Sequence, residues 1–139
     1  MARDPQGIAQ LRQVLSQLYD GNVAPFEAAR ADSYTLHVPG QSRIAGRYQG
    51  AAETARFIAT LSELSGGSFA VTRTAEICIS GNWAMVPLRV TAEVGDLRLD
   101  MPAFGIWRFD GAEIVEHWTL HMDQYAFDRF VAAAEAPLP

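Results

Sequence analysis

The hydrophobic pattern changes its period at Gly66-Gly67, and this change limits the possible fold more than any other feature of the sequence. Before these glycines, apolar residues recur every three or four positions, which predicts helices. After them, apolar and polar residues alternate, which predicts four strands at about 68–79, 83–94, 97–109 and 112–122. The links between the strands are short, turn-like segments. Short links join antiparallel neighbours, so the C-terminal half predicts an antiparallel sheet.

The N-terminal half predicts helices and one short strand. Ile8, Leu11, Leu15 and Leu18 recur at helical spacing. The expected elements are helices at 7–20 and 24–30, a strand at 33–38, a helix from Gly50 to about 65 and a last helix at about 124–134.

Helices that are separated in the chain from a run of strands predict an α+β fold. We expect a cone-shaped α+β barrel, in which a curved antiparallel sheet wraps around the N-terminal helices. The chain of 139 residues fits one domain, 1–139, with an ordered core at about 6–134. Such a cone encloses a pocket for a small ligand.

Composition excludes several classes of protein. The net charge is −5, Lys is absent and the Arg residues are scattered, which excludes a surface that tracks nucleic acid phosphates. The sequence contains no run of 18 apolar residues, so no membrane span is expected. The N-terminus lacks the apolar block of a signal peptide. We therefore expect no membrane partner and a cytoplasmic location. Cys78 stands alone and is expected to be a buried structural residue in a strand.

Alternation also assigns the two sides of each strand. In the last strand, Trp118 and Leu120 fall on one side, while His117 and His121 fall on the other. We expect the apolar side to face the core and the histidines to be exposed or at an interface. The strand at 97–109 is apolar on both sides, which indicates a sheet covered on both and thus a homodimer formed through the sheet.

Two segments carry a resemblance to a known family. Residues 37–50, which include a proline and three glycines, are similar to the strand–loop–helix segment of SnoaL-like proteins. Residues 109–118 resemble the last hairpin of these proteins. The chain thus resembles the SnoaL-like and ketosteroid-isomerase-like branch of the nuclear transport factor two-like superfamily, and the resemblance covers nearly its whole length.

The resemblance implies some site residues and leaves other positions unmatched. In ketosteroid isomerases an Asp base precedes the proline-containing loop, and here His37 takes that position. The two positions of the isomerase oxyanion hole hold Val14 and Gly105, and Thr119 follows the last-strand Trp where many SnoaL-like chains carry Asp. The steroid-isomerase set is therefore incomplete.

Two residues are candidates for catalysis. His37 is a general acid or base if it faces the apolar cone, and a structural residue beside a turn if it does not. Asp123 is catalytic or, as the alternative, the N-cap of the last helix. The expected substrate-binding residues are Val14, Leu18, Phe57, Leu61, Met101, Trp107, Trp118 and Leu120. No metal site is expected, since His117 and His121 lie about 13 Å apart along an extended strand.

These observations favour an enzyme that needs no cofactor. We expect isomerase, cyclase or lyase chemistry that moves a proton on a polyketide- or terpenoid-like substrate. One alternative is a binding protein that sequesters a small apolar ligand without changing it. The other is an interaction module whose pocket is filled.

Overall fold

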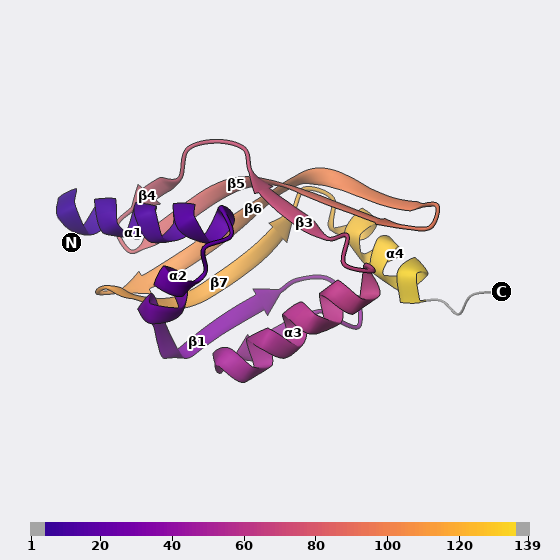
Figure 1. The fold of residues 1–139 in the computed structure, drawn as a ribbon, viewed down its shortest axis with the longest axis horizontal. Helices are drawn as coiled ribbons and strands as arrows, with labels where there is room; N and C mark the ends of the chain where they lie inside the picture. The colour runs from indigo at the N-terminus through magenta and orange to yellow at the C-terminus, as the bar shows by residue number, and fades with distance from the viewer. Residues whose placement is uncertain (1–4, 136–139) are drawn as a thin grey trace.

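A curved, unclosed sheet and the helices that cover one of its faces make up the mixed α+β fold (Figure 1). The structure is a computed structural model and describes residues 5–135. The helices are α1 (Pro5–Tyr19), α2 (Ala24–Ala29), α3 (Gly50–Leu64) and α4 (Gln124–Glu135). The strands are β1 (Arg30–Val38), β2 (Gly46–Gln49), β3 (Ala70–Arg73), β4 (Cys78–Ser80), β5 (Trp83–Val94), β6 (Leu97–Asp110) and β7 (Glu113–His121).

The sheet has the order β2-β1-β7-β6-β5-β3, and β4 also pairs with β5. Most neighbours are antiparallel, as the short links predict, but β1 and β7 run parallel. β1 comes from the N-terminal half and joins the sheet beside the last strand, and α3 packs along it. This pairing brings residues of β1 into contact with residues of β7 that are about 80 positions away in the chain.

The expected helices are confirmed, but the strand predicted at 68–79 is broken into β3 and β4. The ladder between β3 and β5 ends near Pro87, which has no backbone N–H to donate. Residues 74–77 leave the regular ladder, and Cys78 is exposed rather than buried. The edge strand β2 has no counterpart among the predicted strands.

A bulge in β7 decides which side chains face the core. Arg108 pairs with Glu116, but its neighbour Phe109 pairs with Ile114, so Val115 is an extra residue in β7. Ile114 is completely buried beside Phe109. After the extra residue the alternation reverses, and the side chains of His117, Thr119 and His121 lie on the inner face.

Helices cover this inner face from both ends of the sheet. α1 and α2 lie near one end and α4 near the other (Figure 1). Leu11 and Leu15 of α1 are buried, and Phe26 of α2 contacts the rings of Tyr34 and Trp107 edge-on. Within the described residues, no helix has the length and apolar character needed to cross a membrane.

Candidate functional site

A group of polar atoms meets above Gly105, on the inner face of β6. The indole Nε1–H of Trp107 donates to the Tyr19 hydroxyl oxygen over 3.2 Å. A Cβ atom on Gly105 would lie 2.6 Å from this oxygen and 3.4 Å from Nε2 of His117. Gly105 therefore lets three polar groups from α1, β6 and β7 approach one another.

His117 lies flat against the Trp107 ring, with 3.5 Å between ring centroids and an interplanar angle of 6°. Its Nδ1 lies 3.5 Å from the Tyr34 hydroxyl, and its Nε2 is buried without a hydrogen-bond partner. Burial, and secondarily the charge on His37, lowers the pKa of His117 to about 3. The imidazole is thus neutral near pH 7 and has one donor and one acceptor nitrogen.

The tyrosines on either side of this imidazole stay protonated. Burial is the main cause that raises the pKa values of Tyr19 and Tyr34. The Tyr34 hydroxyl lies 3.5 Å from Nδ1 of His117, and in the tautomer in which this hydroxyl donates to Nδ1 the imidazole proton is on Nε2. The Tyr19 oxygen already accepts from Trp107, so its own proton is available to another acceptor. Tyr19 O–H and His117 Nε2–H are then two donors for one oxygen atom of a ligand.

The row of polar side chains continues along β7. Thr119 Oγ1 and His121 Nδ1 are also buried without hydrogen-bond partners. His121 stacks on Phe127 of α4, with 3.9 Å between ring centroids. Burial lowers the pKa of His121 to about 4, although Gln124 and Asp128 act in the opposite direction. An unpartnered buried polar atom costs about 1–3 kcal/mol, so this row favours a ligand that supplies partners.

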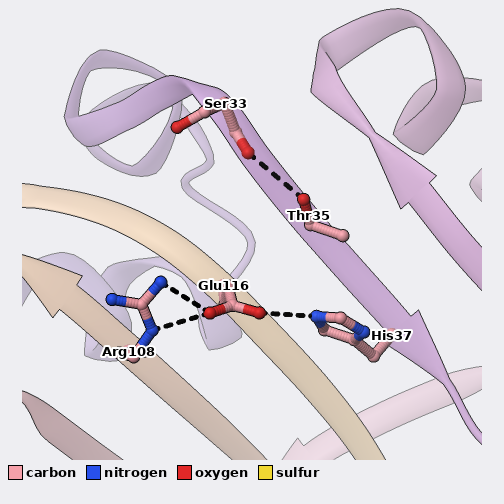
Figure 2. A network of polar contacts seen from close by, with 5 residues as sticks. All are labelled: Ser33, Thr35, His37, Arg108 and Glu116. Carbon is pink, nitrogen blue, oxygen red and sulfur yellow. Dashed lines mark hydrogen bonds and ion pairs between the residues drawn. The ribbon is translucent and has the colours of Figure 1, made fainter.

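His37 lies on the opposite, outer face of the sheet. Its Nε2 lies 2.7 Å from Oε2 of Glu116, whose Oε1 accepts from Arg108 (Figure 2). Burial alone would raise the pKa of Glu116, but the hydrogen bonds from His37 and Arg108 hold it below its usual value. The His37 ring also stacks on Trp118, which neighbours the half-exposed Trp83. A pocket role would require His37 to lie on the inner face with His117. His37 therefore does not occupy the position that this role needs.

Asp123 is at the start of α4 and caps it, since its Oδ1 accepts the N–H of Ala126 over 3.0 Å. Its side chain is exposed. This geometry agrees with the alternative predicted from the sequence, in which Asp123 is the N-cap of the last helix. A catalytic role for Asp123 has no other contact to support it.

The bulge divides the predicted substrate-binding residues between the two faces. Trp107, Met101 and Phe57 are buried in the core, and Val14, Leu18 and Leu61 are partly buried against it. The predicted inward position of Trp118 and Leu120 is wrong, because each pairs with an outward-facing residue of β6, Ile106 and Phe104 respectively. Leu120 is accordingly 38% exposed.

A groove of about 560 Å³ runs beside α1. Gln10, Gln13, Val14 and Gln17 line one wall, and the turn at Gly111 lines another. The groove is open, and His117, Thr119 and His121 are not among the residues that line it. Of the predicted binding residues, Val14 reaches it.

Tyr19, Tyr34 and His117 were not predicted as site residues. Tyr19 continues the helical spacing of Leu11 and Leu15, four residues further along, and this spacing is a signal that places it on the inner side of α1. His117 could not be found by alternation, because one inserted residue moves every later side chain to the other face. Sequence gives no direct sign of that insertion.

Comparisons with known proteins agree with this architecture. The sequence profile of the SnoaL-like domain matches residues 11–117. The chain therefore belongs to the SnoaL-like domain family. A search among curated proteins finds no match.

Solved structures share the fold at low sequence identity. A cystatin-like protein of unknown function from Xanthomonas campestris is 22% identical, with a TM-score of 0.76 over 89% of this chain and 96% of that one. TerC, co-crystallised with polyporic acid, is 13% identical, with a TM-score of 0.72 over 91% and 98%. A putative SnoaL-like polyketide cyclase from Jannaschia sp. CCS1 is 13% identical, with a TM-score of 0.67 over 99% of both chains.

Proposed function

We propose that this protein is a small-molecule enzyme whose pocket lies on the inner face of the sheet and whose reaction moves a proton next to a carbonyl group. The substrate is a mostly apolar, polyketide- or terpenoid-like compound, and the reaction is an isomerisation, cyclisation or elimination. The observation that carries the proposal is the buried, unpartnered Nε2 of His117 beside the hydroxyl of Tyr19.

These two groups act on the oxygen of the substrate carbonyl. When the neighbouring carbon gives up a proton to a water molecule, negative charge builds up on this oxygen. Two donors already in place stabilise that charge without reorganising, and one such donor contributes about 10²–10³ in rate. A neutral imidazole with a lowered pKa is suited to donate a hydrogen bond to a carbonyl, whereas it is a weak base.

Trp107 and Tyr34 position the two donors. The Trp107 ring lies against the His117 ring, and its Nε1–H fixes the Tyr19 oxygen. The Tyr34 hydroxyl, as donor to Nδ1, keeps the His117 proton on Nε2 in the tautomer that this proposal requires. Buried aromatic rings around the site exclude water, which strengthens each hydrogen bond to the developing charge. Two of the similar solved structures support the same class of ligand, since TerC was co-crystallised with polyporic acid and the Jannaschia protein is described as a putative polyketide cyclase.

Deuterium exchange tests the proposal without the natural substrate. In D₂O at pD 7.5, the protein should accelerate exchange of the protons next to the carbonyl of 1-tetralone, followed by ¹H NMR. Tyr19→Phe and His117→Phe keep the aromatic rings but remove the donors. Each should lower the protein-dependent rate about 100-fold. If both variants catalyse the exchange as fast as the wild type, the proposed site is refuted.

The second candidate is a protein that binds such a compound without changing it. Among residues 7–134, whose side chains the structure describes, no Asp or Glu is buried, so the inner face offers no carboxylate base. Under this alternative, 1-tetralone binds to the protein, measured by calorimetry, while its exchange rate stays that of the buffer.

We also propose that two copies of the chain associate through the outer face of the sheet. Trp83 and Leu120 are exposed there by 47% and 38%, and Trp118 lies beside Trp83. The ion pairs of Glu116 with His37 and Arg108 stand beside these apolar side chains. An outer face of this composition is suited to a self-complementary contact with an apolar centre.

A further inference from the structure

Arg30 places a positive charge on the cluster of rings that supports His117. Its guanidinium carbon lies 5.4 Å from the centroid of the Phe26 ring and 5.9 Å from that of the Tyr34 ring. A cation within about 6 Å of an aromatic face is attracted by the π electrons of the ring. Phe26 also contacts Tyr34 and Trp107 edge-on, so the guanidinium belongs to the same cluster as the rings of the site.

No acidic side chain neutralises this charge within the part of the chain that the structure describes. Among residues 5–135, no ion pair includes Arg30 and no hydrogen bond involves its guanidinium. Arg30 is partly buried at the start of β1, where the register between β1 and β7 shifts. Solvent therefore screens its charge only in part, and the charge acts on the two rings that it faces.

Tyr34 connects Arg30 to the site. Tyr34 is 2% exposed, and its hydroxyl oxygen lies 3.5 Å from Nδ1 of His117. A positive charge over the ring favours negative charge on the phenol oxygen, so it makes the O–H group a stronger donor. Burial raises the pKa of Tyr34, and the charge of Arg30 acts against this rise. Because hydrogen bonds in a chain polarise one another, a stronger bond to Nδ1 also strengthens donation from Nε2–H on the far side of the imidazole.

We propose that Arg30 is a positioning residue for His117 and that it acts through Tyr34. Its charge strengthens the hydrogen bond from the Tyr34 hydroxyl to Nδ1, which holds the imidazole proton on Nε2, the nitrogen above Gly105. Arg30 needs no contact with the substrate for this role. The inference rests on the proposed function only for the use of this proton by a carbonyl oxygen. The bond between Tyr34 and His117 is a property of the protein without a ligand.

Three variants separate the charge of Arg30 from its packing. Arg30→Met retains a long side chain over the Phe26 ring and removes the charge. Arg30→Lys retains the charge and is the matched control. Tyr34→Phe removes the hydroxyl and gives the signal of a His117 ring without this donor. Arg30→Gln, which is also uncharged, replaces Arg30→Met if that variant does not fold.

The ¹⁵N signals of the His117 ring measure the bond directly. At pH 7.5 this imidazole is neutral, since burial lowers its pKa to about 3. In the wild type, Nε2 should carry the proton and Nδ1 should be the acceptor. In Arg30→Met, the Nδ1 signal should move toward its position in Tyr34→Phe. In Arg30→Lys, it should stay near its wild-type position.

Deuterium exchange of 1-tetralone measures the effect on the site. Arg30→Met should lower the protein-dependent rate about three-fold in the wild-type background, a change of the size of one cation–aromatic contact. It should have no effect in a Tyr34→Phe background, because the connection from Arg30 to His117 is then already broken. Arg30→Lys should retain most of the wild-type rate.

The outcomes separate this inference from the proposed function. A protonated Nδ1 in wild-type His117, an Nδ1 signal that is unchanged in Arg30→Met, or an equal loss of rate in both backgrounds would overturn the role of Arg30. If the Nδ1 signals behave as expected but the wild-type protein does not accelerate exchange, the proposed function fails and the coupling of Arg30 to His117 stands.

Discussion

The hydroxyl of Tyr19 lies where the side chain of residue 105 would begin: a Cβ atom on Gly105 would be 2.6 Å from Tyr19 Oη. This distance is shorter than real Cβ contacts allow, so α1 and β6 approach closely at this point because residue 105 is glycine. The same approach brings the Tyr19 oxygen to Trp107 Nε1.

Gly105→Ala should therefore be destabilising by about 1–3 kcal/mol, as overpacking of a core usually is. The cost should be about 1 kcal/mol smaller in a Tyr19→Phe background, because the nearest atom has been removed. Urea unfolding of the wild type, the two single variants and the double variant measures this difference. An equal cost of Gly105→Ala in both backgrounds would show that the hydroxyl does not set the contact.

Stability should fall as the pH is lowered from 7 to 5. Burial lowers the pKa of His117 from 6.5 to about 3, so in this range the unfolded chain binds a proton that the folded chain does not. This difference destabilises the fold by about 2 kcal/mol at pH 5 relative to pH 7. His121 acts in the same direction, since its pKa is lowered to about 4.

His117→Phe should remove a large part of this pH dependence. Urea unfolding at pH 7 and pH 5 compares the variant with the wild type, and both values lie above the range in which Glu116 titrates, because its pKa is lowered. If the variant loses as much stability as the wild type, His117 is not a buried neutral imidazole.

Two substitutions at Asp123 distinguish a role as helix N-cap from a role as catalytic acid. Asn caps a helix about as well as Asp, so Asp123→Asn should retain stability, whereas Asp123→Ala should lose about 1 kcal/mol. Both variants should exchange the protons of 1-tetralone at the wild-type rate. Loss of exchange in Asp123→Asn, with stability unchanged, would restore the catalytic interpretation.

The outer face predicts a dimer that one substitution can break. Light scattering should give twice the chain mass of 15.2 kDa for the wild type. Trp83→Glu should give the monomer mass, because a carboxylate would be buried without a partner in the contact. Tyr125→Glu is the matched control, since Tyr125 is 79% exposed on α4 and should leave the dimer intact. A wild-type monomer would contradict the proposed association.

Periodicity was sufficient to predict the α+β class, the helices and the order of the long strands. These features depend on local spacing, which the sequence states directly. The parallel pairing of β1 with β7 depends on contacts between residues about 80 positions apart, and no local signal encodes it. The break between β3 and β4 has a visible cause in Pro87, but only once the partner strand is known.

The site was harder to predict for a more specific reason. One extra residue, Val115, reverses the alternation in β7 and moves His117 inward and Trp118 outward. The same reversal pairs Glu116 with His37 on the outer face. A prediction that follows strict alternation therefore assigns the histidines of β7 to the opposite face from the one that the structure gives. For His37, the sequence left both the pocket role and the structural role open.

The position of the ligand relative to the three histidines tests the account most directly. The chain contains only His37, His117 and His121, so ¹⁵N-labelled histidine gives a spectrum in which each ring nitrogen is resolved. On addition of 1-tetralone, the account predicts a shift of the Nε2 signal of His117 and an unchanged His37. A shift confined to His37, or no shift at His117 under saturating ligand, would contradict a pocket on the inner face of the sheet.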